Sequence, residues 1–388
     1  MIEKKVLFIA NSIVGKSPGL SGGESRFIEL GKYWQKMGYE IHLQSSEGGK
    51  VLCDKMGLKV ILHKITSTDQ ESRAEMYRRM ITLFIDLPKI IIEFKSGIVY
   101  STSEQVYDAL PGFFLKLFYG KNIKWASAVH WLPPVLFWQR KSSKWYNSLF
   151  FMISERLGLI LAYLLADSLF PVSAATYNDM YKSRFRGRKI KTVKCGVNLS
   201  EIESLIDKGQ EKIYDAVFLK RIQAVKGIFD LIDIWEIVVK KLPQEKLIII
   251  GNGIDEVEAK KLVTEKKLDE NIKFLGAIYD LKEKYNYLAQ SKLFLLPSYE
   301  ENWAIVVGEA LACGTPVMVY RLKELEEVWK DSITYINISN KEAFAEKIVD
   351  FLTNNSEYEE RSRQGIEYVK QYDWAQIAFE EMDFILKN

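Results

Sequence analysis

The sequence predicts an α/β protein of two domains, each built around a parallel β-sheet, from three observations. The chain has 388 residues, more than one hydrophobic core usually supports. Near the C-terminus, an apolar run at 292–296 is ended by Pro297, residues 305–312 resemble an apolar helix, and 316–320 form another strand-like run. The first half also opens with a strand, at 6–11, before a glycine- and serine-rich loop. Such strand–loop–helix units are typical of parallel sheets, which bind ligands at the carboxyl ends of their strands.

The first half continues as alternating strands and helices. Residues 24–37 have helical spacing and end at Gly38, and 39–44 form the next strand. Further strands are predicted at 51–53, 59–62, 98–101, 124–129 and 169–173, with a helix at 174–181. Gly22 and Gly23 precede the first helix, where glycine lets backbone N–H groups approach an anion. Ordinary turns also contain paired glycines, so both interpretations stay open.

His130 directly follows the strand predicted at 124–129 and precedes Pro133 and Pro134, which stiffen the loop. Loops at the carboxyl ends of strands are where α/β folds hold reactive groups. A single histidine is more often structural, so position alone leaves its role open. His42 and His63 have no comparable context.

Charge is distributed unevenly along the chain. The formal net charge is +3, but residues 113–200 contain 14 Lys and Arg against 3 Asp and Glu. Aromatic residues interleave with these cations, namely Trp131, Phe137, Trp138, Trp145, Phe150 and Phe151. A core helix with basic edges and an interfacial patch at an anionic membrane explain this pattern about equally well. No aromatic–basic RNA-binding motif accompanies the charge, so an anionic membrane or acceptor is favoured over nucleic acid.

The second half opens with a strand at 215–219, a basic loop at 220–227 and a helix that runs to Leu242. Arg221 and Lys226 lie five positions apart in the loop, and a guanidinium fork with a second cation suits a diphosphate. A basic surface loop is the common alternative. Further strands are predicted at 247–253 and 272–276, and an amphipathic helix at 374–386.

Two carboxylates belong to the C-terminal strand–loop–helix unit. Glu301 lies in the loop after the strand at 292–296, and Glu309 lies inside the helix at 305–312. Periodicity alone favours a solvated helix edge for Glu309 over a ligand-facing carboxylate.

The segment 297–317 resembles the Glu-x7-Glu signature of retaining glycosyltransferases of family 4, with Glu301 and Glu309 as its carboxylates. The loop with Arg221 and Lys226 is similar to the family's Arg-x4-Lys-Gly loop. Similar matches are the glycine pair before the first helix, the turn at 195–198 between the domains and the closing helix. The resemblance covers nearly the whole chain.

This resemblance implies the GT-B fold, in which two Rossmann-like domains face each other across a cleft. Residues 1–198, with a crossover helix at 372–388, would bind the acceptor, and residues 199–371 would bind the nucleotide sugar. The implied reaction is transfer of a sugar from a nucleotide-diphosphate sugar to an acceptor hydroxyl with retention of configuration. The expected acceptor is a lipid-linked or surface glycan.

The resemblance also implies roles for residues. Arg221 and Lys226 would stabilise the departing β-phosphate, Glu309 would bind the ribose, and Glu301 and His130 would hold the sugar. The remaining donor-binding positions would be Gly22, Gly23, Ala277, Ile278, Asn302, Trp303 and Ala304. The family usually has Gly-Phe-Gly where this chain has Asn302, Trp303 and Ala304, so the backbone approach to the donor is expected to differ.

No metal or cofactor is expected, and neither is a disulfide. The chain has no Asp-x-Asp triplet, three separated cysteines (Cys53, Cys195 and Cys313) and three histidines. The first apolar stretch is too short for a signal peptide, and no apolar run is long enough to span a bilayer. A cytoplasmic protein is therefore expected, and attachment to the cytoplasmic face of the membrane stays open together with the interpretation of the basic and aromatic region.

Two alternative functions share this architecture. A GT-B-type sugar-nucleotide epimerase would need additional carboxylates in the first domain, and the sequence shows no such cluster. A non-catalytic nucleotide-sugar-binding membrane scaffold would have no need of Arg221, Lys226, Glu301 and Glu309 together.

Overall fold

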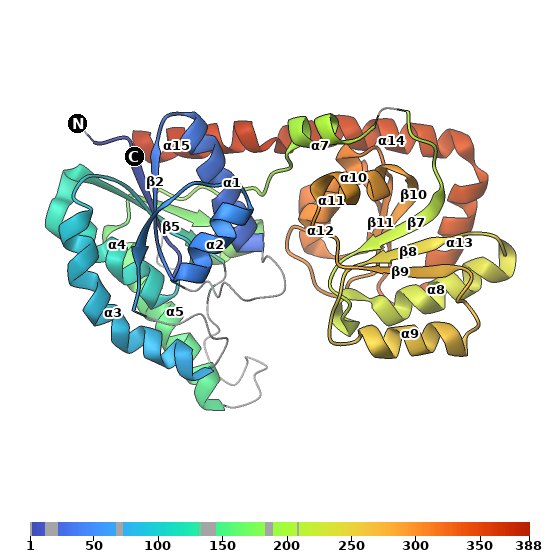
Figure 1. The fold of residues 1–388 in the computed structure, drawn as a ribbon, viewed down its shortest axis with the longest axis horizontal. Helices are drawn as coiled ribbons and strands as arrows, with labels where there is room; N and C mark the ends of the chain where they lie inside the picture. Colours follow the sequence, from blue (N-terminus) through green and yellow to red (C-terminus); the bar gives the residue numbers. More distant parts are fainter. Residues whose placement is uncertain are drawn as a thin grey trace. The chain divides into compact units, whose positions relative to one another are not determined.

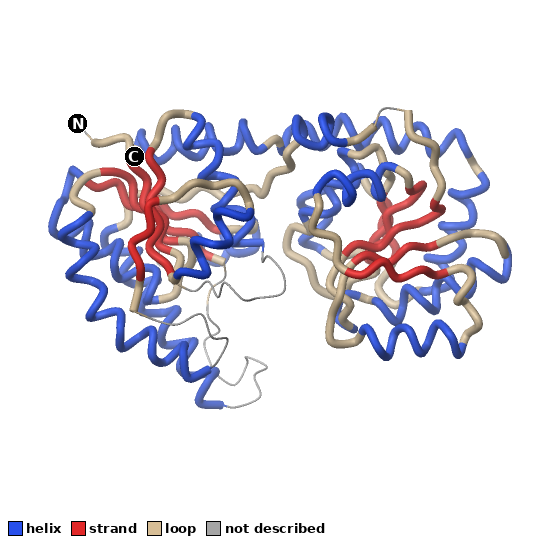
Figure 2. The backbone as a smooth tube through the Cα atoms, viewed as in Figure 1, coloured by secondary structure: helices blue, strands red, loops and turns tan. Residues whose placement is uncertain are grey.

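The structure is a computed structural model that describes residues 2–11, 22–66, 73–130, 132, 145–182, 189–207 and 209–388. The chain divides into two compact units, residues 1–194 with 374–388 and residues 195–373. Each unit contains one six-stranded sheet with parallel strand pairs (Figure 2). Helices flank both sheets, which confirms the predicted α/β class.

The first unit has the strand order β3-β2-β1-β4-β5-β6. Its strands are β1 (Lys5–Ile9), β2 (Glu40–Ser45), β3 (Ile61–Lys64), β4 (Gly97–Ser101), β5 (Ile123–Val129) and β6 (Ser168–Pro171). Its helices are α1 (Gly22–Lys36), α2 (Glu47–Lys55), α3 (Arg73–Glu93), α4 (Val106–Tyr119), α5 (Trp145–Leu165), α6 (Ala174–Lys182) and, from the C-terminus, α15 (Trp374–Lys387).

Neighbouring residues of these strands face two different helical layers. Phe8 of β1 stacks on Trp34 of α1, with ring centroids 5.5 Å apart, and the Trp34 indole donates a hydrogen bond to the Ala378 carbonyl of α15. Leu7 of β1 belongs instead to a buried cluster that includes the inner side of α3, α4 and α5. One face of the sheet is therefore covered by α1 and α15, and the other by α3, α4 and α5.

The second unit has the strand order β12-β11-β10-β7-β8-β9. Its strands are β7 (Tyr214–Leu219), β8 (Leu247–Ile250), β9 (Ile272–Gly276), β10 (Ser291–Leu296), β11 (Val317–Tyr320) and β12 (Thr334–Ile336). Its helices are α7 (Leu199–Leu205), α8 (Ile228–Lys241), α9 (Glu256–Glu265), α10 (Leu281–Ala289), α11 (Ile305–Ala312), α12 (Lys323–Trp329), α13 (Lys341–Thr353) and α14 (Asn355–Val369).

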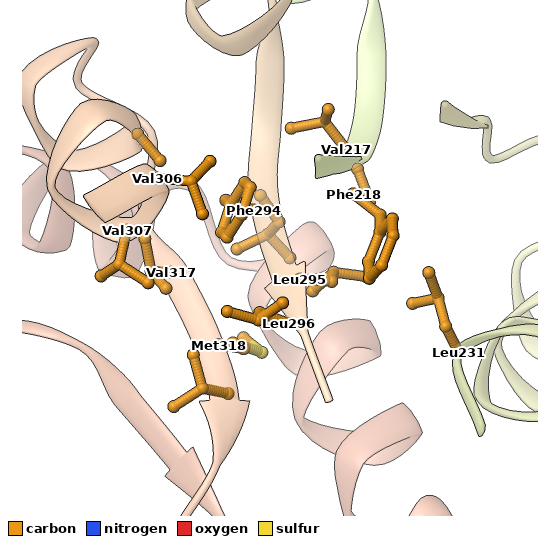
Figure 3. Packing of buried hydrophobic residues seen from close by; sticks show 14 of the residues in the cluster. Val217, Phe218, Leu231, Phe294, Leu295, Leu296, Val306, Val307, Val317 and Met318 are labelled. Carbon is orange, nitrogen blue, oxygen red and sulfur yellow. The ribbon is translucent and has the colours of Figure 1, made fainter. Parts of the chain in front are cut away.

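The core of the second unit is centred on β7, β10 and β11, and the apolar side chains in the middle of β7 and along β10 and β11 are almost fully buried. Figure 3 shows Phe218 of β7 and Leu295 of β10 near Leu231 of α8, and Val306 and Val307 of α11 near Phe294. These apolar contacts fix the ends of the central strands and hence the loops that leave them.

One predicted strand is wrong. Residues 51–53 lie within helix α2, not in a strand. The Ser46 side chain caps this helix by accepting a hydrogen bond from the backbone N–H of Gly49 at 3.3 Å, and Cys53 is buried on its inner side. Three residues are too few to distinguish a helical from a strand period.

Candidate active site in the second unit and the His130 region of the first

The chain order of the second sheet reverses between β7 and β10. From β7 the chain continues to β8 and β9 on one side, whereas β10 leads to β11 and β12 on the other side. Open α/β sheets bind ligands at such a switch point, beyond the carboxyl ends of the strands. The loop 220–227 leaves β7 and the loop 297–304 leaves β10, so both predicted donor loops lie at this point.

Direct backbone contacts join these two loops. The N–H of Tyr299 donates to the carbonyl of Val225 at 3.0 Å. Gly227 has a φ of 78°, and a Cβ at this position would lie 1.8 Å from the carbonyl oxygen of Pro297. Only glycine therefore allows the two loops to come so close at this point, and this close contact brings Lys226 to the loop 297–304.

The Glu301 carboxylate is buried between two lysines. Its side chain is 6% exposed; Oε1 lies 3.1 Å from Nζ of Lys226 and Oε2 lies 3.0 Å from Nζ of Lys220. Ser298 donates a further hydrogen bond to Oε1, at 3.2 Å. Two cations against one carboxylate leave a net positive charge at the strand ends, which suits an anionic ligand.

Lys226 is held more firmly than Arg221. Its ammonium group also donates to the carbonyl of Glu300 at 2.6 Å, and the residue is buried. The side chain of Arg221, in the same loop, is exposed. Lys220 was not among the residues predicted from sequence, although it directly follows the buried strand β7.

Glu309 is not on a solvated helix edge, contrary to the expectation from periodicity. Its side chain is 16% exposed, and Oε1 accepts from Nζ of Lys284 of α10 at 2.8 Å. Ala277 and Ile278 are half-buried and lie just before α10. Lys284 was missed by the sequence analysis. It lies in α10, and no local pattern connects α10 with α11, the helix that follows after strand β10.

The three residues that replace the Gly-Phe-Gly motif have distinct environments. Ala304 immediately precedes α11 in the left-handed region, with φ 53° and ψ 67°, where glycine would avoid a cost of about 1–2 kcal/mol. The Trp303 ring packs edge-to-face on Tyr372, with centroids 5.0 Å apart, and its carbonyl accepts from the Trp329 indole. Asn302 is exposed.

Asp230, in the first turn of α8, anchors the loop that carries Glu301. Its carboxylate accepts hydrogen bonds from the hydroxyls of Tyr320, at 2.7 Å, and Tyr299, at 2.5 Å, and lies 3.0 Å from Nζ of Lys341. Burial and the bond to Asp230 raise the pKa of Tyr299 above its ordinary value. The sequence analysis missed this anchor, whose members lie in four separate segments.

In the first unit, His130 follows β5 as predicted and is held on two sides. Its backbone N–H donates to Oε2 of Glu104 at 2.8 Å, and ring Nε2 lies 2.9 Å from the carbonyl oxygen of Thr102. A carbonyl can only accept, so Nε2 carries the proton and Nδ1 is the acceptor of the neutral ring. Burial raises the pKa of the Glu104 carboxyl.

The structure brings Gly23 and His130 together. A Cβ on Gly23 would lie 3.2 Å from Cε1 of His130, so a larger residue would crowd the ring. Gly22 is the first residue of α1. Of the aromatic and basic region, Trp131, Phe137 and Trp138 lie outside the described residues, and so does the side chain of Trp145.

The described residues contain no group of three or more His, Cys, Asp or Glu side chains that could hold a metal ion. No helix within the described ranges is long and apolar enough to cross a bilayer.

Two protein-family models match the sequence. The model described as glycosyl transferases group 1 matches residues 203–371, and the one described as glycosyltransferase family 4 matches residues 20–201. Together they span most of both units.

Two proteins with similar sequences are named as glycosyltransferases. An uncharacterized glycosyltransferase of Haemophilus influenzae is 26% identical over 208 residues, which are 52% of this chain and 56% of that protein. Phosphatidyl-myo-inositol mannosyltransferase of Mycobacterium leprae is 29% identical over 160 residues, 40% of this chain and 42% of that protein. The chain thus spans about half the length of these two relatives.

Among solved structures, HepE of Anabaena in complex with UDP superposes with a TM-score of 0.75 at 16% identity, covering 99% of this chain and 100% of that chain. Sucrose-phosphate synthase of Thermosynechococcus elongatus gives a TM-score of 0.73 at 16% identity, covering 99% of each chain. Because both structures are only 16% identical to this chain, their similarity shows a shared fold and no more.

Proposed function

This chain belongs to the group 1 glycosyltransferases and has the GT-B fold that its sequence predicted, and from this premise we propose that it transfers a sugar from a nucleotide-diphosphate sugar to an acceptor hydroxyl with retention of configuration. The observation that supports the proposal most strongly is the Glu301 carboxylate between Lys220 and Lys226 at the switch point of the second sheet. A UDP complex of HepE is consistent with a nucleotide donor.

In the proposed reaction, the bond between the sugar C1 and the β-phosphate oxygen breaks, and a bond from C1 to the acceptor oxygen forms. The nucleoside diphosphate leaves with the electron pair of the broken bond, and the proton of the acceptor hydroxyl passes to the departing diphosphate oxygen. Negative charge grows on the β-phosphate during departure. Lys226 and Arg221 would stabilise this charge, aided by the N-terminal ends of the neighbouring helices.

Two carboxylates would divide the recognition of the donor. Glu309 would accept hydrogen bonds from the ribose hydroxyls, and Glu301 would hold the sugar. To do so, Glu301 would exchange part of its contact with Lys220 and Lys226 for sugar hydroxyls, while the lysines turn to the diphosphate. The backbone of residues 302–304 would line the same side of the sugar.

His130 would hold the sugar through its ring. The Nε2 proton is directed to the Thr102 carbonyl, so Nδ1 of the neutral ring would act as an acceptor for a sugar hydroxyl. Glu104 would position the histidine through its backbone rather than contact the substrate. Lysine, arginine and helix termini would replace a bridging divalent metal, and we propose that the reaction requires no metal or cofactor.

The proposed acceptor is a glycan or a lipid-linked molecule at a membrane surface. The experiment that tests the function is release of nucleoside diphosphate from a panel of nucleotide sugars, with and without candidate acceptors, followed by analysis of the product anomer. Acceptor-dependent release with retention is expected. An epimerase would convert the sugar nucleotide without acceptor consumption, and a scaffold would bind it unchanged.

A further inference from the structure

Helix α3 is apolar on the side that faces away from the sheet. Its inner side buries Leu87 and Ile90 in the cluster that includes the strands of the sheet, as in any helix that covers a core. Its outer side carries Ile81 and Phe84, which are 70% and 68% exposed. A surface helix normally has polar residues in those positions, so this exposure calls for a partner.

Helix α5 repeats the pattern. Ile153, Leu157, Ile160 and Leu164 recur at the three- and four-residue spacing that forms one stripe on a helix, and each is exposed. The opposite side of the helix buries Leu159 in the core.

These outer sides belong to one layer. Helix α4 packs against both α3 and α5, and the inner residues of the three helices share one buried cluster (Figure 1). Helix α4 adds exposed Leu117 and Phe118. We call this surface the apolar face; its residues are Ile81, Phe84, Ile85, Ile92, Leu117, Phe118, Ile153, Leu157, Ile160 and Leu164, all 45–70% exposed.

The charges on and beside the apolar face are mostly positive. Its exposed cations are Arg78, Lys89, Lys95, Lys121 and Arg156. Among the side chains that the structure describes on α3, α4 and α5, Glu93 is the exposed acidic one, and it lies 2.5 Å from His63. Exposed apolar side chains beside cations are the combination that binds an anionic bilayer surface.

We propose that the apolar face docks on an anionic lipid membrane. This deepens the proposed function, on which it rests for the nature of the acceptor, and it places the contact on the outer sides of α3, α4 and α5. A second copy of the chain is a poorer occupant, because pairing two such faces would bring their cations together. Inserted isoleucine, leucine and phenylalanine side chains would supply binding that salt does not screen, and the cations would supply the rest.

The test is co-sedimentation with vesicles of phosphatidylcholine alone or mixed equally with phosphatidylglycerol, at low and high salt. Wild-type protein should bind the mixed vesicles at least tenfold better than the neutral ones. The double variant Phe84→Glu with Ile160→Glu should lose at least tenfold in binding. The matched control is Phe379→Glu, a 62% exposed aromatic of α15 on the other face of the same sheet, which should bind as wild type.

Thermal melting should show that both variants fold. If the double variant does not fold, a second double variant, Leu117→Ser with Leu164→Ser, replaces it, and the same loss of vesicle binding is expected. No binding of the wild type to mixed vesicles at low salt would overturn the proposal. Equal vesicle binding by the folded double variant and the wild type would also overturn it. The same holds if the wild type is a dimer that does not bind vesicles and the double variant is a monomer. Binding of a panel of nucleoside diphosphates is measured by calorimetry in parallel. Absence of binding to every member would contradict the proposed function and leave the vesicle result to decide the apolar face.

Discussion

The ammonium group of Lys226 lies 3.1 Å from Oε1 of Glu301, and both side chains are buried where the loops after β7 and β10 meet. Lys220 approaches the other oxygen of the same carboxylate. In this arrangement the carboxylate holds two lysine ammonium groups at the ends of the central strands before any ligand binds. An entering diphosphate would draw these ammonium groups from the carboxylate, which would then be available to sugar hydroxyls.

The two carboxylates of the predicted signature should differ in what they recognise. Glu309→Gln should weaken binding of the nucleoside diphosphate by about tenfold or more, since it removes a charged acceptor for the ribose hydroxyls. Glu301→Gln should reduce turnover far more than nucleoside diphosphate binding. Calorimetry and steady-state kinetics measure the two effects, with exposed Glu346→Gln as the control. Equal losses of nucleotide affinity in both variants would refute this division.

Chelation should leave the activity intact. Lysine and arginine side chains would stabilise the departing diphosphate, so a divalent cation is not needed for that charge. The measurement is the transfer rate after dialysis against EDTA, compared with the rate after addition of Mg²⁺ or Mn²⁺. Abolished transfer that either metal restores would show that the proposed metal independence is wrong.

Helix α15 should depend on one buried ion pair for its attachment to the first unit. The Arg26 guanidinium contacts the Glu381 carboxylate, which also accepts from the Tyr100 hydroxyl at 2.8 Å. Glu381→Leu would remove the carboxylate that balances the charge of the buried Arg26 guanidinium, at a cost of about 3–5 kcal/mol. For a unit of this size the melting temperature should fall by about 6–20 °C.

The control for this change is Lys387→Met, which removes an exposed ion pair with Asp383 on the same helix. In calorimetric melting, the free energy of unfolding of the control should change by less than about 1 kcal/mol. A melting temperature of Glu381→Leu equal to that of wild type would mean that the buried pair contributes nothing to the attachment of α15.

His42 should make the first unit less stable in mild acid. Burial lowers the pKa of its ring below the ordinary 6.5, although the hydrogen bond that the ring donates to the Glu40 carboxylate opposes this; His63 and Lys5 add to the lowering. As the pH falls below 6.5, the unfolded chain therefore takes up the proton first, and stability that is fully present above pH 6.5 is lost.

Urea unfolding of wild type and His42→Gln between pH 8 and pH 5 measures this effect. The wild type should lose more stability than the variant below about pH 6.5. Parallel pH profiles for the two proteins would contradict the assignment, since Glu93 and His63 remain in both.

The fold was largely predictable where apolar periodicity is long and bounded by glycine or proline. The predicted helix at 305–312 has the same bounds in the structure, between the Ala304 turn and Gly314. The predicted strand at 51–53 failed because a short apolar run in a capped helix carries no distinguishable period. Short segments depend on caps and burial, which local sequence describes poorly.

The contacts of the candidate site were less predictable than its residue types. Glu301, Glu309 and Lys226 stand in recognisable motifs, but Lys220 bonds to a carboxylate 81 positions away and Asp230 to a tyrosine 69 positions away. Such pairs form because the switch point joins loops from distant segments. A single sequence carries no signal for them beyond the strand ends to which they are attached.

The most direct test of the proposed reaction is the rate of acceptor-dependent nucleoside diphosphate release by Lys226→Ala, measured against wild type and against Lys240→Ala. Lys240 is an exposed lysine of α8, so its variant controls for loss of a charge in the same unit. We predict a loss of about 100-fold or more for Lys226→Ala, with a normal melting curve, and a near-wild-type rate for Lys240→Ala. A folded Lys226→Ala enzyme that releases the diphosphate at the wild-type rate would contradict the account.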